Sequence, residues 1–161
     1  MRTTYQTTNG KGLNRNCLPM RLWEKAKKYG IWNPSDIDFS QDMIDFKKLT
    51  QQEKDFILLA VSQFQAGEEA VTLDLLPLIM AIAKEGRLEE ELFLTSFLWE
   101  EAKHVDGFNR WINEVTPFGG KEIESNHVPS YQLILNQILP QSLQALVDDP
   151  SPVNQVKAST T

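Results

Sequence analysis

The chain has 161 residues, of which 41% are hydrophobic and 24% are charged, and its formal net charge is −6. This composition fits one soluble globular domain with a hydrophobic core and argues against a disordered chain. An acidic chain without a basic stripe is a poor partner for nucleic acid. No apolar run reaches the roughly 18 residues of a membrane span, and the N-terminus has no signal-peptide core. With Cys17 as the one cysteine, no internal disulfide is possible, and we expect a cytoplasmic protein.

Glycines and prolines are frequent in residues 1–40. This region is predicted to be an irregular N-terminal wrap with one short helical piece over residues 22–28. Turn and N-cap signals follow at residues 33–36 and 40–42, after which a helical spacing of apolar residues begins at Met43.

Two long helices are predicted in the middle of the chain. Thr50 and Glu53 match the capping-box pattern, and the apolar periodicity that follows predicts a helix over residues 53–84. Pro77 lies inside it and is expected to kink this helix rather than end it. After Gly86 a second periodic segment predicts a helix over residues 88–115.

Two further helical segments are predicted near the end. Residues 131–146 keep a helical register that Pro140 kinks or divides, and residues 153–161 are typical of the first turns of another helix. Strand signals are nearly absent, so the predicted fold class is all-α, a helical bundle. We expect one domain over residues 1–161, and we expect it to be cut from a longer protein because the last helix has too few residues to bury a face.

Glu68 interrupts the apolar stripe of the first long helix at its centre. It follows Phe64 by four residues and precedes Val71 by three, which places all three on one face. A lone buried carboxylate costs several kcal/mol unless a cation or metal compensates it. Glu69 falls on a more polar face, so the periodicity favours Glu68 as the inward-facing carboxylate.

The second long helix repeats this anomaly. Glu101 follows Phe97 by four residues, and His104 follows Glu101 by three, on the same face. Glu-x-x-His on one helix lets the glutamate bridge two ions while the histidine binds one of them. By the same test Glu100 faces a more polar side and is expected to be solvated.

The two anomalies are predicted to lie at the same height. Glu68 lies 18 residues before Gly86 and Glu101 lies 15 after it, so at about 1.5 Å per residue both are roughly 22–27 Å from the turn. We therefore predict that Glu68, Glu101 and His104 bind metal. The alternative interpretation is a buried ion pair or a solvated face.

Other kinds of site receive little support. A zinc protease would need two histidines four residues apart, and the sequence holds only His104 and His127. Glu124 and His127 repeat the Glu-x-x-His spacing, but they lie between two glycines and a proline and are predicted to form a surface loop. No nucleophilic triad or phosphate-binding loop pattern occurs. The tryptophans are expected to pack between elements, with electron transfer as an alternative: Trp23, Trp32, Trp99 and Trp111.

Four segments resemble one known family. They are residues 63–72 (QFQAGEEAVT), 99–104 (WEEAKH), 33–39 (NPSDIDF) and 149–152 (DPSP). Together they closely resemble the N-terminal half of the ligand-binding oxidases related to the small, radical-generating subunit of class I ribonucleotide reductase.

The resemblance implies a ferritin-like four-helix bundle with a manganese–iron or diiron centre that activates dioxygen, and a bound long-chain fatty acid near the metals. It implies that Glu68, Glu101 and His104 are ligands from the first helix pair, with Glu101 a bridging candidate. Val71 resembles the valine whose β-carbon becomes joined to a tyrosine oxygen. The resemblance also suggests a homodimer.

The family's site needs a second glutamate helix, a second Glu-x-x-His and the cross-linking tyrosine, none of which occurs in these 161 residues. Either the sequence is a fragment, which we favour, or another chain completes the site. Besides a metal-dependent oxidase, two hypotheses remain open. One is a lipid-binding helical protein whose metal serves assembly or sensing, and the other is a ribonucleotide reductase small subunit.

Overall fold

The computed structural model describes residues 3–117, 123 and 127–160, and within these residues it contains helices and no strand. The α-helices are α1 (Leu18–Tyr29), α2 (Ser40–Lys48), α3 (Gln51–Asp74), α4 (Leu76–Lys84), α5 (Leu88–Val115), α6 (Pro129–Leu133), α7 (Leu139–Asp148) and α8 (Pro152–Thr160). The structure also gives bounds for two 3-10 turns and a π-helical segment: Gln6–Thr8, Pro34–Asp36 and Ile134–Ile138. The all-α prediction is confirmed. Among the described helices, none has the length and apolarity to cross a membrane.

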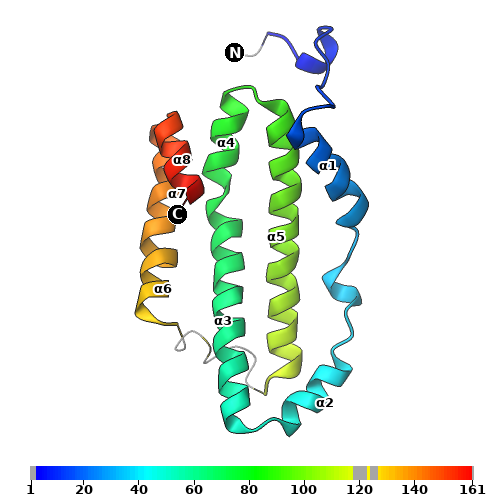
Figure 1. The fold of residues 1–161 in the computed structure, drawn as a ribbon, viewed down its shortest axis with the longest axis vertical. Helices are drawn as coiled ribbons and strands as arrows, with labels where there is room; N and C mark the ends of the chain where they lie inside the picture. Colours follow the sequence, from blue (N-terminus) through cyan, green and yellow to red (C-terminus); the bar gives the residue numbers. More distant parts are fainter. Residues whose placement is uncertain (1–2, 118–122, 124–126, 161) are drawn as a thin grey trace.

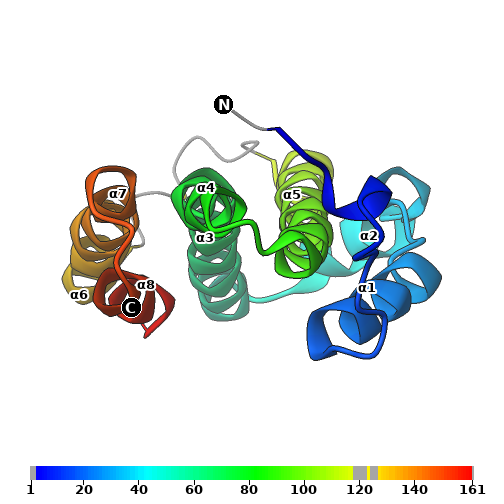
Figure 2. The same cartoon turned by 90° about the horizontal axis from the view of Figure 1, so that it is seen from above.

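The centre of the fold is an antiparallel hairpin in which α3 and α4 run end to end beside α5 (Figure 1). Helices α1 and α2 lie on the α5 side of this hairpin, and α6, α7 and α8 lie on the α3–α4 side. Viewed from above, the helices form a broad layer (Figure 2). The flanking helices therefore lie along the two edges of the hairpin (Figures 1 and 2).

The hairpin begins and turns where the sequence predicts. The Thr50 hydroxyl accepts a hydrogen bond from the Glu53 N–H at 3.3 Å, and the Glu53 carboxylate accepts one from the Thr50 N–H at 2.8 Å. At the other end, Gly86 has a φ of 73°, a left-handed conformation that suits glycine and lets the chain reverse direction. Helix α5 has the bounds that the periodicity predicts.

The kink predicted near Pro77 lies at the junction of α3 and α4. Proline has no N–H and cannot bond to the carbonyl four residues earlier, so regular α-helix is interrupted there. Leu75 keeps helical angles, with φ −70° and ψ −23°, and α4 continues roughly in line with α3 (Figure 1). The helix predicted over residues 53–84 is thus two helices, α3 and α4, that run end to end with the interruption at Leu75, two residues before Pro77.

Pro140 divides the third helical segment. The π-helical residues Ile134–Ile138 separate α6 from α7, and the Leu139 N–H donates to the carbonyl of Ile134, five residues back. Pro140 is the second residue of α7, where its missing N–H is tolerated. The predicted final helix forms as α8.

The N-terminal region is more helical than predicted. The short piece expected over residues 22–28 is a helix of 12 residues, Leu18–Tyr29, with Pro19 in its first turn. Met20 of this helix is 1% exposed, and α1 packs along α5. The apolar face of α1 extends the helix beyond what its glycine- and proline-rich surroundings suggest.

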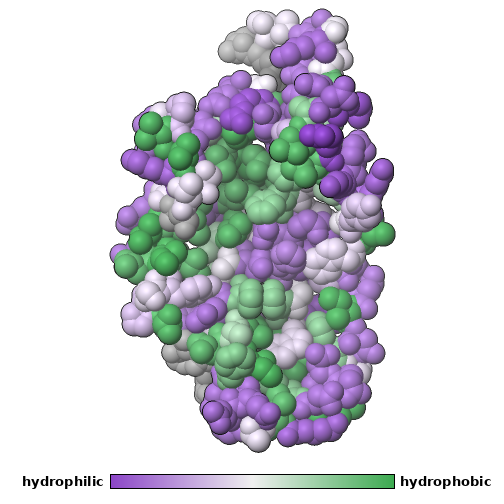
Figure 3. All heavy atoms as spheres, viewed as in Figure 1, coloured by the Kyte–Doolittle hydropathy of each residue, from purple (hydrophilic) through white to green (hydrophobic). Residues whose placement is uncertain are grey.

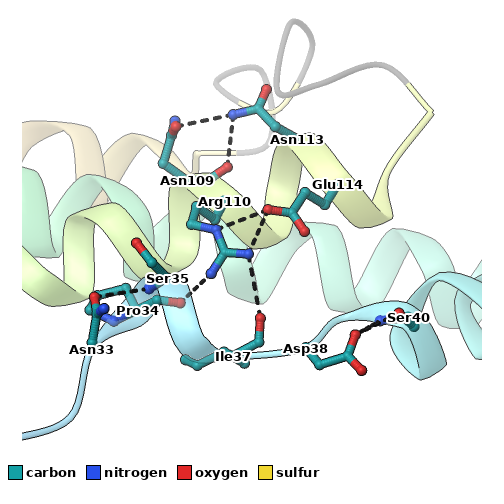
Figure 4. Close-up of polar contacts among 10 residues, drawn as sticks. All are labelled: Asn33, Pro34, Ser35, Ile37, Asp38, Ser40, Asn109, Arg110, Asn113 and Glu114. Carbon is teal, nitrogen blue, oxygen red and sulfur yellow. Dashed lines mark hydrogen bonds and ion pairs between the residues drawn. The ribbon is translucent and has the colours of Figure 1, made fainter.

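Arg110 of α5 holds the segment between α1 and α2 (Figure 4). Its guanidinium donates hydrogen bonds to the carbonyl oxygens of Pro34 and Ile37 and pairs with Glu114, with Nη2 2.8 Å from Oε1. The guanidinium also lies 5.2 Å from the centroid of the Phe39 ring. One side chain thus fixes the N-terminal wrap against the long helix.

Two clusters of buried hydrophobic residues lie at opposite ends of the hairpin. One joins α2, α3 and α5 and consists of Phe39, Phe46, Leu58, Ile112, Val115 and Ile123. The other joins α7 and α8, with Leu78 of α4 packed against it, and consists of Leu143, Leu146 and Ala158. The middle of the hairpin lies between these two clusters, and it is there that the predicted metal ligands meet.

Candidate metal centre

The structure brings Glu68 of α3 together with Glu101 and His104 of α5. One ligand atom from each residue lies within 4.8 Å of the others. His104 Nδ1 is 3.2 Å from Glu68 Oε2 and 3.6 Å from Glu101 Oε2. The equal height expected for these positions in an antiparallel hairpin is confirmed.

The two carboxylates of this cluster oppose each other electrostatically. Burial raises the pKa of Glu101, a hydrogen bond to Glu68 and the charge of Glu68 raise it further, and His104 lowers it in part, with the pKa reaching about 7. The side chains of Glu101 and Glu68 are 13% and 19% exposed. Two half-buried carboxylates beside one imidazole need a proton or a cation for balance.

This donor set fits a transition metal. Carboxylate oxygen and imidazole nitrogen suit both manganese and iron, and the closeness of the three atoms lets a single ion contact all of them. The elevated pKa of Glu101 indicates that the hairpin alone does not neutralise the charge of the cluster.

Trp32 supports the imidazole ring of His104. The two rings stack with centroids 5.6 Å apart and an interplanar angle of 24°. The indole Nε1 of Trp32 donates to Glu100 Oε2 at 2.7 Å. Lys103 Nζ lies 2.8 Å from Glu100 and donates to the carbonyl oxygens of Gly30 at 3.0 Å and Trp32 at 3.3 Å. The backbone and the ring of Trp32 are therefore both fixed beside the cluster.

The expectation that Glu100 is solvated is wrong. Its side chain is 26% exposed and receives hydrogen bonds from Trp32 and Lys103. Burial acts to raise the pKa of Glu100, but the hydrogen bonds from Lys103 and Trp32 outweigh it and hold this pKa below its usual value. The spacing of Glu100 and Lys103 is visible in the sequence, whereas no sequence signal connects them with Trp32, about seventy residues away.

The apolar stripes are less buried than predicted. The side chains of Phe64 and Phe97 are 60% and 39% exposed, although both share the face of the metal cluster. Trp99 is 63% exposed, against the expectation that it packs between elements. Trp111 does pack, edge-on against the Phe46 ring at 6.0 Å. Periodicity identified the apolar face correctly, but in this arrangement few described residues cover it.

The remaining predicted positions lie as follows. Val71 is half-buried on α3, one turn after Glu68, and its assignment as a cross-link position stays a prediction. Glu69 is exposed, as its polar face predicts. In the loop that repeats the Glu-x-x-His spacing, residues 124–126 lie outside the described residues. His127 Nε2 is 3.0 Å from the carbonyl oxygen of Ser62, apart from the metal cluster.

A pocket of about 360 Å³ opens beside His104. Its lining is almost entirely apolar and comes from the N-terminal wrap, α3 and α5: Trp32, Ile37, Phe39, Val61, His104, Gly107, Phe108 and Trp111. An apolar molecule bound there would lie against His104, the predicted metal ligand.

Comparison with known proteins places this geometry in a family. Residues 20–117 match the sequence profile of the family "Ribonucleotide reductase, small chain". Among solved structures, a variant of R2-like ligand-binding oxidase with tyrosine changed to phenylalanine and an aerobically reconstituted Mn/Fe cofactor is 43% identical, with a TM-score of 0.93. A valine-to-leucine variant of such an oxidase, also with an aerobically reconstituted Mn/Fe cofactor, is 42% identical, again with a TM-score of 0.93.

Each of these two matches covers 99% of this chain and 58% of the oxidase chain. The chain thus spans less than two thirds of the length of these oxidases, and its fold is ferritin-like, as the resemblance implied. The matched residues 20–117 include α3 and α5 with all three members of the metal cluster. The chain belongs to the ribonucleotide reductase small chain family.

Proposed function

We propose that this chain is the metal-carrying part of a dinuclear oxidase that uses a manganese–iron or diiron centre and dioxygen. The observation that carries the proposal is the cluster of Glu68, Glu101 and His104 at the centre of the hairpin. The Mn/Fe cofactors of the R2-like ligand-binding oxidases support it, since those proteins share the fold at 42–43% identity.

The roles of the residues follow from their chemistry. Glu68 and His104 are the terminal ligands, and Glu101, which faces both, is the bridging candidate. Because its pKa is about 7, Glu101 gives up its proton when a cation binds at neutral pH. Trp32 and Glu100 keep the imidazole in place through the stacked ring and the hydrogen bond. A bound metal pair would supply two-electron reduction of dioxygen.

Two finer assignments belong to the same proposal. Val71, one turn from Glu68, is the position at which the β-carbon is joined to a tyrosine oxygen outside these 161 residues, with loss of two hydrogens to dioxygen. The apolar pocket beside His104 receives the acyl chain of a long-chain fatty acid, which its lining favours. The proposed setting is the cytoplasm, and the proposed assembly is a homodimer.

A second candidate is a lipid-binding protein whose metal has a structural or sensing role. The apolar pocket favours it, because the pocket needs no chemistry at the metal to bind an acyl chain. A small subunit of ribonucleotide reductase, which the family match also allows, would instead store a radical for a larger partner.

Metal analysis and oxygen uptake test the proposal together. The full-length protein that carries these 161 residues is loaded with Mn(II) and Fe(II) without air, its metal content is measured, and oxygen consumption is followed on aeration. We expect bound metal and oxygen uptake in the wild type and in Glu69→Gln, and loss of both in Glu101→Gln. Bound metal without oxygen uptake would support the lipid-binding candidate, and wild-type protein that binds no metal would refute the proposed site.

A further inference from the structure

The turn of α3 that carries Glu68 lies outside the two buried hydrophobic clusters. Neither cluster includes a residue of 63–71. Figure 3 shows hydrophobic atoms above and below a hydrophilic patch at mid-height over α3 and α5. A metal site needs its ligands held to within about 0.5 Å of the right geometry. Polar contacts should therefore help to fix the backbone of α3 at this level.

Tyr131 of α6 makes such a contact. Its hydroxyl donates a hydrogen bond to the carbonyl oxygen of Gln63. In an α-helix this carbonyl also accepts the N–H of Gly67, four residues on, and a carbonyl oxygen has a lone pair for each of the two donors. Glu68 is the residue after Gly67. The phenol hydroxyl therefore binds α3 at the hydrogen bond that closes the turn before the proposed metal ligand.

Gly67 lets the hydroxyl come this close. A Cβ atom at this position would lie 3.1 Å from the Tyr131 oxygen, which is tighter than most Cβ contacts in proteins. Gly67 is the one glycine of α3, and glycine inside a helix lowers stability relative to alanine. Its φ is not positive, so the close approach of Tyr131, and not the backbone conformation, is the reason that the structure offers for a glycine here.

His127 supports the phenol ring of Tyr131. The two rings meet edge to face, with centroids 5.6 Å apart and an interplanar angle of 61°. His127 Nε2 is 3.0 Å from the carbonyl oxygen of Ser62, and because a carbonyl oxygen only accepts, this nitrogen carries the hydrogen. Two side chains four residues apart thus bind two consecutive carbonyls of α3, those of Ser62 and Gln63.

The Tyr131 hydroxyl stays uncharged beside the carboxylates. Burial raises the pKa of Tyr131, the N–H of Gly67 lowers it in part, and the charge of Glu68 raises it. The hydroxyl is thus close enough for the charge of Glu68 to act on it. At neutral pH it is a neutral hydrogen-bond donor that adds no charge to the metal cluster.

We propose that Tyr131 is a positioning residue for Glu68. By anchoring the Gln63 carbonyl, Tyr131 sets the rotation and height of α3 at this turn and so directs the Glu68 carboxylate toward the ligands on α5. This inference rests on the proposed function in taking Glu68 as a metal ligand. Because Tyr131 acts through the backbone of α3, loss of its hydroxyl should change how the metal is held and not whether the helix forms.

Mn(II) binding by the full-length protein that carries these 161 residues tests the inference, with Tyr131→Phe as the variant. Phenylalanine keeps the ring, and the Gln63 carbonyl keeps the N–H of Gly67, so the fold should persist. We expect the Mn(II) affinity to fall roughly tenfold, as for other contacts that orient a metal ligand. The EPR spectrum of bound Mn(II), which reports the geometry of its ligands, should change as well.

Two controls separate positioning from stability. Thr50→Ala weakens the same helix at its N-cap, far from the cluster, and should leave both the Mn(II) affinity and the spectrum unchanged. Tyr29→Phe removes the hydroxyl of a tyrosine that is 77% exposed and should also leave them unchanged. If Tyr131→Phe behaved like Thr50→Ala, with lower stability but the same affinity and spectrum, Tyr131 would only support the fold and the inference would fail.

A double-mutant cycle with Gly67→Ala tests the contact itself. In the wild-type background the added Cβ, 3.1 Å from the hydroxyl oxygen, should displace Tyr131 and weaken Mn(II) binding several-fold. In the Tyr131→Phe background that oxygen is absent, so Gly67→Ala should change the affinity little. Equal effects in the two backgrounds would contradict a link between Tyr131 and the turn of Glu68.

The inference and the proposed function can fail separately. Wild-type affinity and an unchanged spectrum in Tyr131→Phe would overturn the positioning role and leave the proposed metal site standing. Wild-type protein that binds no Mn(II) would refute the proposed site, and the positioning role with it.

Discussion

Replacing Lys103 by methionine should destabilise this chain strongly although it removes no metal ligand. The Lys103 side chain is 7% exposed, and its ammonium has three acceptors: Glu100 at 2.8 Å and the carbonyls of Gly30 and Trp32 at 3.0 and 3.3 Å. Methionine keeps much of the apolar stem but leaves the Glu100 carboxylate and two carbonyls without this donor. Losing one partner of a buried ion pair costs about 3–5 kcal/mol.

The lower end of that range applies here. Glu100 is 26% exposed and keeps its hydrogen bond from Trp32, so water and the indole compensate part of the lost charge pairing. We expect a loss of about 3 kcal/mol in the free energy of unfolding. For a chain of this size, that corresponds to a fall in Tm of roughly 6–12 °C.

Urea denaturation followed by circular dichroism measures this change, and Lys48→Met provides the control. Lys48 makes the same i, i+3 contact with Asp45 at 2.9 Å, but its side chain is 66% exposed, and such surface pairs contribute less than about 1 kcal/mol. Adding Glu100→Gln to Lys103→Met should restore part of the stability, because no uncompensated charge then remains. Equal losses in Lys103→Met and Lys48→Met would refute the reasoning.

Three further predictions concern the site, the cap and the wrap. The pKa of Glu101 is raised from 4.5 to about 7 in the folded chain. Between these two pH values the metal-free folded chain holds a proton that the unfolded chain has lost. The free energy of unfolding should therefore fall as the pH rises from 4.5 to 7, by up to about 3 kcal/mol. Thermal unfolding with chelator measures this slope, which Glu101→Gln should remove. Thr50→Ala should cost about 1 kcal/mol through loss of the capping box, with Mn(II) affinity unchanged by titration. Arg110→Met should expose residues 30–39 to limited proteolysis, since it removes the donors to Pro34 and Ile37; cleavage rates equal to those of the wild type would show that the wrap is held by other contacts.

Local pattern was enough to predict the helices that carry the site. The capping box at Thr50 marks where the hairpin starts, and Gly86 marks where it turns. The apolar period indicates which face of each helix is apolar. Once those are set, the level of Glu68 against Glu101 follows from the rise per residue alone. This is why the meeting of Glu68, Glu101 and His104 could be predicted from the sequence.

Contacts between distant parts of the chain could not be predicted in the same way. Trp32 meets Glu100 and His104 only because α1 and the turn after it lie along α5, and no period in the sequence records that arrangement. For the same reason Glu100 was wrongly expected to be solvated. The helical periodicity predicts the direction in which the Glu100 side chain leaves α5, but it does not predict that the Trp32 indole lies there.

Exposure of the Phe64 side chain has a different cause. Periodicity tells which face of a helix is apolar, and it says nothing about which element covers that face. In this chain the flanking helices lie along the edges of the hairpin, so Phe64 stays 60% exposed beside the cluster. A correct pattern thus led to an incorrect expectation of burial.

The hairpin and the metal are linked through Glu101. Keeping this carboxylate charged in the folded, metal-free chain above pH 7 opposes folding by up to about 3 kcal/mol. A ligand at a hundred times its Kd stabilises the folded state by about 2.7 kcal/mol, which is nearly the same amount. Metal binding of moderate affinity is therefore enough to offset the cost of the two facing carboxylates. A cation bound at the proposed site should therefore stabilise the folded chain more at pH 7 than at pH 5, because Glu101 is already neutral in the folded chain at the lower pH.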